Sequence, residues 1–235
     1  MSAIDVAEVV DDFATFGVRA FTTSRAAGSF GFHSTEPTVD VMRRWSALRE
    51  ELSSGATRLA TASQVHGTRV VVHGQGWEGW LRVDRADGHA SLDQGTAMAV
   101  TIADCVPVFL AHPSGAVALL HSGWRGTAAR IVESGIAALA KRGVPVAELW
   151  VHLGPSICGN CYEVSPDVYA KLTSRSAAEP SCVDLRAVIA DHAHAAGVKR
   201  ITTSPLCTRC DNGRLYSHRS GDEGRQLAVI LAELL

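Results

Sequence analysis

The sequence predicts an α/β fold in which a mixed β-sheet is covered by helices. Short apolar or β-branched runs of strand length alternate with amphipathic stretches. No G-x-G-x-x-G segment follows any of these runs, which argues against a dinucleotide-binding fold. The 235 residues contain no internal repeat and no long Pro/Gly/Ser linker. We therefore expect residues 1–235 to form a single domain.

The predicted strands are apolar runs that end at turn-forming residues. β-Branched and aromatic side chains favour the pleated, buried surface of a sheet. Five segments meet this description: residues 68–73, 97–102, 106–111, 116–120 and 149–153.

Three segments have the periodicity or the end signals of a helix. Residues 127–142 place apolar side chains at intervals of three and four, and a basic Lys-Arg-Gly stop follows. Ser165 and Pro166 are typical of an N-cap and a first helical position. Near the C-terminus, four leucine and isoleucine side chains share one helical face and predict a docked helix: Leu227, Ile230, Leu231 and Leu234.

Charge and composition exclude several classes of partner. Lys and Arg total 22 and Asp and Glu total 24, so the net charge of −2 gives no general attraction to nucleic acid or to an anionic membrane. No apolar run approaches the ~20 residues needed to cross a bilayer. The N-terminal stretch is acidic where a secretory signal would be basic. We expect a cytoplasmic protein that is a monomer or a small homo-oligomer.

Reactive side chains gather in three turn-rich segments beside predicted strands: Gln64–Gly67, Ala103–Pro107 and His121–Gly126. One thiolate and two imidazoles, from His66, Cys105 and His121, form a ligand set suited to zinc. Three protein ligands leave one position open, as in catalytic zinc sites. The alternative is that the cysteine is a small buried side chain and that the histidines are ordinary core residues.

Arg125 lies just before the helix predicted from Thr127, where backbone N–H groups and a guanidinium can recognise an anion together. We expect Arg125 and the backbone N–H groups of Gly126 and Thr127 to hold phosphate. The alternative is an arginine that pairs with a surface carboxylate. Asp104 is a candidate proton acceptor, or a residue that orients a ligand imidazole.

Two C-x-x-C motifs supply a second candidate site. They are Cys158/Cys161 and Cys207/Cys210, and together they could form a four-cysteine zinc site. The 45 residues between the pairs exceed the roughly 15–20 of ribbon-like sites. A redox dithiol is the alternative for either pair. Cys182 stands alone, and we expect it to pack.

Five segments in order carry a resemblance to a known family: QVHG, ADCVPVFL, HSGWRGT, GPSICGNCYEV and CT…GRLYSHR. They resemble the YfiH family, also described as multicopper polyphenol oxidase or laccase-domain proteins, over roughly residues 21–225. The resemblance implies a single domain with mixed β-sheets layered between helices. It also implies His66, Cys105 and His121 as the zinc ligands.

The activity implied by the resemblance is phosphorolysis of purine nucleosides. The implied substrates are inorganic phosphate with adenosine, inosine, guanosine or S-methyl-5′-thioadenosine, and adenosine deamination is the implied second activity. Part of the family is described as a peptidoglycan editing factor. Gln64 and Arg25 are expected to contact substrate, although the TTSRAAGSFGFHSTEP segment around Arg25 is shorter than in the family. Cys210 also departs from the family pattern, and no family role is transferred to it.

Other classes of protein remain open at this point. Cys105 and His121 could instead act as nucleophile and base of a metal-free cysteine hydrolase. Copper also suits a His/Cys/His set, so a copper-dependent polyphenol oxidase is a further alternative, although such oxidases need several coppers. A non-enzymatic binding protein is the remaining class.

Overall fold

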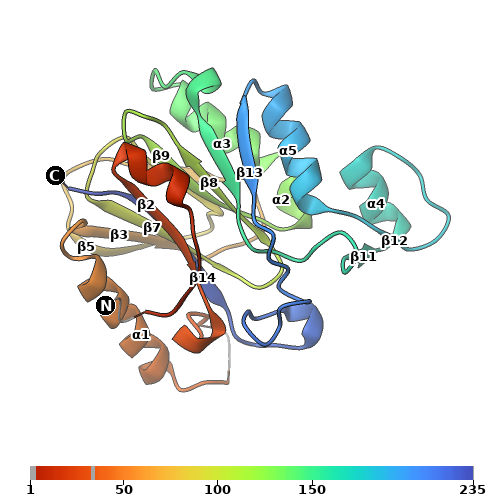
Figure 1. The fold of residues 1–235 in the computed structure, drawn as a ribbon, viewed down its shortest axis with the longest axis horizontal. Helices are drawn as coiled ribbons and strands as arrows, with labels where there is room; N and C mark the ends of the chain where they lie inside the picture. Colours follow the sequence, from red (N-terminus) through yellow and green to blue (C-terminus); the bar gives the residue numbers. More distant parts are fainter. Residues whose placement is uncertain (1–3, 33–34, 235) are drawn as a thin grey trace.

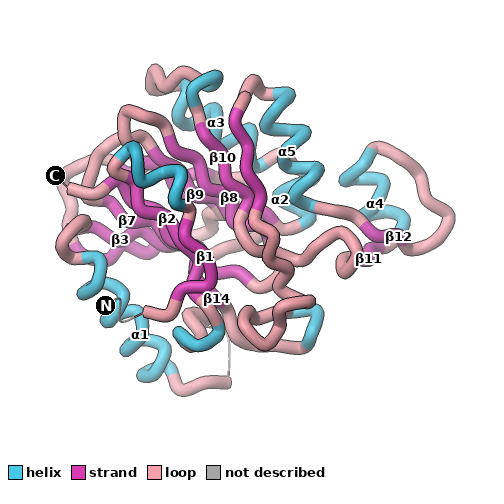
Figure 2. The backbone as a smooth tube through the Cα atoms, in the orientation of Figure 1, coloured by secondary structure: helices cyan, strands magenta, loops and turns pink. Residues whose placement is uncertain are grey.

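Two facing β-sheets are built from strands with long apolar runs. The computed structural model describes residues 4–32 and 35–234; Met1–Ala3, His33, Ser34 and Leu235 lie outside the described residues. Over the described residues there are two six-stranded mixed sheets, and helices lie on the outer side of each (Figures 1 and 2). The predicted fold class, mixed sheets layered between helices, is confirmed.

The first sheet has the strand order β1-β2-β14-β7-β3-β5. Its strands β3, β5 and β7 run parallel to one another, and the other neighbours are antiparallel. The bounds are β1 Val6–Val9, β2 Val18–Thr23, β14 Gln226–Ala232, β7 Thr96–Ile102, β3 Arg58–Ala62 and β5 Gly79–Val83.

The second sheet has the strand order β13-β10-β8-β9-β6-β4. Strand β10 is parallel to β13, and β4 is parallel to β6. The bounds are β13 Arg200–Thr203, β10 Trp150–Leu153, β8 Val106–Ala111, β9 Val117–Ser122, β6 Gly88–Ser91 and β4 Val70–His73. A small separate ribbon pairs β11 (Glu163–Val164) with β12 (Ser181–Cys182).

Helices close the outer faces of the sheets. Helix α1 buries Trp45 and Leu48 against the first sheet, and α3 buries Ile136 against the second. Figure 1 shows α2, α3 and α5 together on the side opposite α1, with α4 projecting beside β11 and β12. The bounds are α1 Thr38–Leu52, α2 Trp124–Ala128, α3 Ile131–Ala140, α4 Pro166–Thr173 and α5 Leu185–Ala195; the 3-10 helices are η1 Asp11–Phe16, η2 Arg25–Ala27, η3 Val146–Glu148 and η4 His218–Ser220.

The C-terminal segment is a strand, so the helix predicted there is wrong. Every residue of β14 is buried. Leu227 and Leu231 face the core shared with α1, whereas Ala228 and Ile230 face the core between the sheets. Because both faces of the strand are buried, its sequence is apolar from residue 227 to residue 232 and matches the apolar spacing of a helix.

The structure has two helices where the sequence predicted one over residues 127–142, and the first of them starts earlier than predicted. Helix α2 begins at Trp124, and α3 follows after Arg130, which adopts a left-handed conformation with φ of 62°. That residue ends the first helical run and redirects the chain. The predicted N-cap Ser165 and first-turn Pro166 are confirmed at the start of α4.

Across residues 4–32 and 35–234, no helix has both the length and the apolar character that crossing a bilayer requires.

Candidate metal centre

The structure brings together the side chains that the sequence nominates as metal ligands. His66 lies between β3 and β4, Cys105 lies between β7 and β8, and His121 lies in β9. One potential ligand atom from each lies within 4.8 Å of the others. The two imidazole rings meet edge to face, with centroids 4.8 Å apart. These donors are the soft and borderline types that zinc and copper prefer, so the residues fit such an ion.

Strand pairing explains why two of these residues meet. Strands β8 and β9 are antiparallel neighbours, with Val106 opposite Ser122. Cys105 and His121 therefore lie at the same end of this pair. His66 has φ of 60°, and Asp104, beside Cys105, has φ of 80°. Non-glycine residues with such backbone angles are uncommon, and strained backbone concentrates at functional sites.

Asp87 organises the cluster, and the sequence analysis missed it. Its fully buried carboxylate accepts hydrogen bonds from the backbone N–H groups of Val65 (3.1 Å), His66 (2.8 Å) and Gly67 (2.7 Å). It also contacts Nδ1 of His121 at 2.9 Å. A carboxylate at Nδ1 fixes the imidazole so that Nε2 is free for a metal. The sequence offers no spacing signal for this aspartate, because it acts through backbone groups of another loop.

Gly123 leaves the space that the cluster occupies. A Cβ atom at this position would lie 2.9 Å from Sγ of Cys105 and 2.9 Å from Cδ2 of His66. Either distance is shorter than a normal van der Waals contact. Glycine is therefore required here by the close approach of these side chains.

The cluster holds a thiolate beside an imidazolium. Burial opposes the charged form of Cys105, yet the charge and hydrogen bond of His121, with help from His66, lower the pKa of Cys105 to about 6. Burial also opposes the charge on His121, but Cys105 and then Asp87 raise the pKa of His121 to about 9. The pKa of Asp87 is lowered despite burial, mainly by its hydrogen bond with His121. The thiol is thus prepared to lose its proton, as a metal ligand or a nucleophile must.

Two cavities meet at the cluster, among the residues that the structure describes. The first has a volume of about 370 Å³ and includes Phe32, Trp45 and Arg82 in its walls. The second has a volume of about 420 Å³ and includes Arg125 and Arg219. His66, Ala103, Cys105 and His218 line both. His218 was not predicted from the sequence, because a lone histidine before an arginine carries no spacing signal.

The phosphate pocket predicted around Arg125 is only partly reproduced. The exposed guanidinium of Arg125 lies over the ring of Trp124, 4.4 Å from its centroid, at the edge of the second cavity. It belongs to the first turn of α2 and does not precede a helix at Thr127. The N–H group of Thr127 donates to the carbonyl of Gly123, and Gly126 is buried. These corrections follow from the earlier start of the helix, and of the predicted phosphate-binding groups the Arg125 side chain is the one that remains at the cavity.

Asp104 is anchored by a threonine hydroxyl and a backbone N–H group. Its Oδ1 accepts a hydrogen bond from Oγ1 of Thr208 at 2.6 Å, and its Oδ2 accepts one from the backbone N–H of Arg219 at 2.7 Å. The carboxylate that contacts a ligand imidazole is that of Asp87, not that of Asp104 as the sequence analysis considered. Asp104 instead joins the Cys105 turn to the segment that carries His218.

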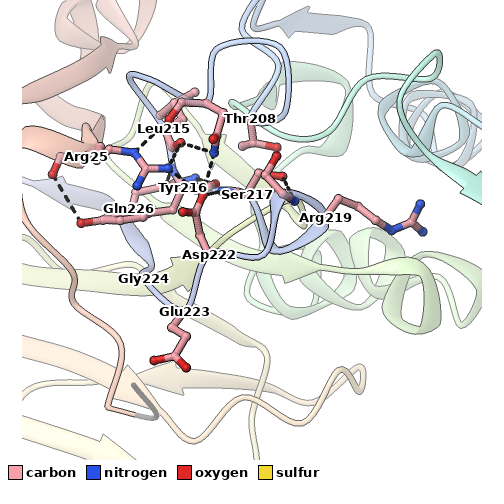
Figure 3. A network of polar contacts seen from close by, with 12 residues as sticks. Arg25, Thr208, Leu215, Tyr216, Ser217, Arg219, Asp222, Glu223, Gly224 and Gln226 are labelled. Atoms are coloured by element: carbon pink, nitrogen blue, oxygen red, sulfur yellow. Dashed lines mark hydrogen bonds and ion pairs between the residues drawn. The ribbon is translucent and has the colours of Figure 1, made fainter. Parts of the chain in front are cut away.

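Arg25, expected to contact substrate, is held in a polar network (Figure 3). Its guanidinium forms an ion pair with Asp222 at 2.6 Å and donates to the carbonyls of Asn212 and Leu215. It also lies over the ring of Tyr216. These contacts fix the loop that leads to the cavity wall, so the geometry favours a positioning role over direct contact.

Gln64 lines the first cavity, as expected of a substrate contact, but its amide is already paired. Oε1 accepts from the N–H (2.9 Å) and the hydroxyl (2.8 Å) of Thr101, and Nε2 donates to the Thr101 carbonyl at 2.9 Å. These hydrogen bonds connect the loop that carries His66 to the C-terminal end of β7.

A family model described as multi-copper polyphenol oxidoreductase laccase matches residues 17–233. The chain belongs to this family. The resemblance to the YfiH family that the motifs indicated is thereby confirmed. A crystal structure of the Bacillus licheniformis hypothetical protein YfiH has a TM-score of 0.88 to this laccase-family chain, with 22% identity, and 98% of each chain is covered.

Curated relatives of the laccase-family chain include proteins named for nucleoside chemistry. A purine nucleoside phosphorylase of Streptomyces coelicolor is 33% identical over 187 residues, which cover 75% of this chain and 76% of that protein. Adenosine deaminase RL5, from an unknown prokaryotic organism, is 28% identical over 235 residues, which cover 86% of this chain and 88% of that protein.

Proposed function

We propose that this chain is a zinc-dependent purine nucleoside phosphorylase whose metal is bound by His66, Cys105 and His121. The observation that carries the proposal is the position of this three-residue cluster at the junction of two cavities. A site with three protein ligands leaves a position for a substrate atom or water. The names of the relatives support the class of substrate.

The first cavity suits the nucleoside. Its volume of about 370 Å³ falls in the usual range of small-molecule sites. Phe32 and Trp45 stack with an interplanar angle of 3° and give an aromatic wall. The guanidinium of Arg82 lies 4.8 Å from the centroid of Phe32 and adds a donor next to that wall. An aromatic face with a few polar groups is the usual setting for a purine and its ribose.

The second cavity suits phosphate. Arg125 and Arg219 both line it, and each guanidinium is held over an aromatic ring, Trp124 and Tyr162 respectively. Guanidinium groups bind phosphate oxygens in pairs of hydrogen bonds. Phosphate bound here would lie on one side of the cluster, with the nucleoside on the other side.

In the reaction, a phosphate oxygen forms a bond to ribose C1′ while the bond from C1′ to purine N9 breaks, and the departing purine accepts a proton. Arg125 and Arg219 would hold the nucleophile and offset its charge, so that positioning and electrostatics supply much of the rate. His218 lines both cavities and is our candidate donor of the proton to the purine. Asp104 has both oxygens occupied, so we assign it a positioning role.

When bound, zinc would supply a Lewis acid and lower the pKa of a coordinated water toward ~7. The same property would serve adenosine deamination, which we propose as a second activity on the strength of the relative named adenosine deaminase. Inosine and guanosine carry an oxygen at C6 in place of the amino group that adenosine loses, so neither of them could be deaminated at C6. Phosphorolysis of inosine, guanosine and S-methyl-5′-thioadenosine remains part of the proposal.

The test combines metal analysis with a phosphate-dependent adenosine assay on one sample. We expect bound zinc and release of adenine and ribose 1-phosphate only when phosphate is present. Cys105→Ala should lose both the metal of this site and the activity. Cys182→Ala is the matched control, because Cys182 is an exposed cysteine in β12. Full turnover by Cys105→Ala would refute the assignment of Cys105 as a ligand. Copper in place of zinc in the active protein would show that the proposed metal is wrong.

The role of Arg125 has its own test. Arg125→Ala should raise the KM for phosphate more than the KM for adenosine, because the guanidinium lines the phosphate side. Arg142→Ala, at an exposed position after α3, is the control. An equal effect on both substrates would remove the phosphate assignment.

A metal-free cysteine hydrolase is the second candidate, and one observation favours it. Cys105 contacts His121, and His121 contacts Asp87, which is the arrangement of a nucleophile, the base that takes its proton and a carboxylate that orients the base. Rapid alkylation of Cys105 that abolishes activity in fully active, metal-free protein would support this candidate. Phosphate-dependent activity that requires metal would exclude it.

A further inference from the structure

The two C-x-x-C motifs lie at the ends of neighbouring parallel strands. Strand β10 pairs with β13 in register from Trp150 opposite Arg200 to Leu153 opposite Thr203. Each strand is followed by a turn that carries one motif. Parallel neighbours end at the same edge of a sheet, so turns distant in sequence are placed side by side. A further parallel bridge joins Ser156 to Cys207.

The four thiols converge on one point. We define the four-cysteine cluster as Cys158, Cys161, Cys207 and Cys210. Their Sγ atoms all lie within 4.8 Å of one another. The Sγ atoms of Cys161 and Cys210 are 3.5 Å apart. Tetrahedral zinc with Zn–S bonds of ~2.3 Å places its sulfurs roughly 3.8 Å apart. The separations therefore match a shared ion, with small adjustments of side-chain torsion angles.

Backbone groups are already aimed at one of the sulfurs. The N–H groups of Cys158 (3.3 Å) and Cys210 (3.4 Å) both donate to Sγ of Cys207. N–H dipoles directed at sulfur stabilise its charged form, which is the form that binds a metal. Arg209 donates from Nη1 to the carbonyl of Cys161 at 3.1 Å and places a positive charge beside the cluster.

We propose that the four-cysteine cluster binds one structural zinc ion, separate from the site at His66, Cys105 and His121. Binding of Zn²⁺ converts four thiols to four thiolates and releases four protons, which leaves a zinc–thiolate unit of charge −2. Four thiolates fill all positions of a tetrahedral ion, so this site has no vacancy for a substrate. Arg209 offsets part of the negative charge.

The zinc would brace the wall of the candidate metal centre. The turn that carries Cys207 and Cys210 also carries Thr208, whose N–H donates to the carbonyl of Ser156 and whose hydroxyl donates to Asp104. Asp104 in turn accepts from the N–H of Arg219, and Figure 3 shows Thr208 and Arg219 in one polar network. An ion that fixes the two turns together would therefore hold Asp104, next to Cys105, in place.

The decisive experiment uses wild-type protein under reducing conditions, with N-ethylmaleimide as the alkylating probe and mass spectrometry of peptides as the readout. Cys210 and Cys182 are both exposed, so exposure alone predicts similar labelling. We expect Cys210 to be labelled more slowly than Cys182, and removal of the metal by a chelator to speed the labelling of Cys210 at least about tenfold without changing that of Cys182. Equal rates before chelation, or a disulfide between Cys161 and Cys210 in place of bound metal, would overturn the proposal.

Metal content gives an independent measurement. The double variant Cys161→Ser/Cys210→Ser should contain one zinc per chain less than Cys182→Ser, whose substitution lies outside the cluster. An unchanged zinc content would overturn the proposal, and the wild-type labelling decides the question if the double variant fails to fold. Cys105→Ala should leave the protection of Cys210 intact, so failure of the proposed enzymatic function can be told apart from failure of this site.

Discussion

The two thiol-containing clusters differ in how many ligands they offer and in how the chain delivers them. The cluster of His66, Cys105 and His121 draws on two connections and the end of strand β9, contains a residue with positive φ and opens onto two cavities. The four-cysteine cluster draws on two turns that follow paired parallel strands, and all its ligands are thiols. A zinc ion with three protein ligands keeps one position open for substrate or water. A zinc ion with four protein ligands can only hold parts of the chain together. If both proposals hold, the same element of the sequence, a cysteine in a turn, serves two different purposes.

The largest effect is expected from a substitution at the cluster of His66, Cys105 and His121, which we call the open cluster because it borders two cavities. His121→Ala should reduce phosphorolysis at least roughly 10³-fold, because it removes a ligand and the partner of the Cys105 thiolate together. Steady-state kinetics and metal analysis of the same sample would measure this. His194→Ala, on α5, is the matched control. If His121→Ala retained both metal and turnover, the open cluster would lose its proposed role, while the labelling of Cys210 would be unaffected.

Substitution of Asp87 tests whether the open cluster depends on the hydrogen bonds that the buried carboxylate accepts. Asp87→Asn keeps the shape but places an NH₂ group where a carboxylate oxygen accepts hydrogen bonds from N–H donors. We expect about 2–4 kcal/mol lower stability and a roughly 10- to 100-fold lower affinity for the metal. Chemical denaturation and competition with a chelator would measure the two effects. Asp93→Asn, where the carboxylate pairs with Gln75 near the surface, should change neither.

A pH series can test whether the thiol of Cys105 is deprotonated near neutral pH. The pKa of Cys105 is lowered to about 6 by His121, so in metal-stripped protein its alkylation rate should rise roughly tenfold between pH 5 and pH 7 and then level off. Reactivity increases with pH because deprotonation creates the thiolate, and an ordinary thiol would rise only toward ~8.5. Peptide-resolved alkylation would give the profile. A midpoint near that of an ordinary thiol would show that His121 does not stabilise the thiolate.

The fold class and the three members of the open cluster could be predicted from the sequence. The type and the ends of some helices and strands could not. Strands such as β8 and β9 were identified because their apolar runs end at turn residues. The C-terminal strand β14 was mistaken for a helix because both of its faces are buried, which removes the alternation that marks a strand. The break at Arg130 went unpredicted, since a left-handed arginine has no signature in the sequence.

Some features of the two sites arise from contacts between distant parts of the chain. The spacing of residues in the sequence could not predict them. Asp87 acts on a loop 20 residues away through backbone N–H groups, so its residue type alone does not reveal it. The spacing of the cysteine pairs argued against a shared site, yet the parallel pairing of β10 with β13 brings them together. Sequence distance is a poor guide wherever a parallel crossover separates two ligand pairs.

Thr208 links the two clusters, and its substitution should have the smallest effect. Thr208→Val removes the hydroxyl that donates to Asp104 and leaves all cysteines in place. One hydrogen bond to a charged group is worth about 1.5–3 kcal/mol, of which only the part that displaces Asp104 reaches the chemistry. We therefore expect a severalfold lower kcat, unchanged metal content and rescue by Thr208→Ser. Because a purely structural residue would lower stability without affecting kcat, restoration of kcat by the serine hydroxyl would show that the turn of the four-cysteine cluster supports the open cluster through the contact of Thr208 with Asp104. A kcat equal to that of the wild type in Thr208→Val would instead mean that the two clusters act independently.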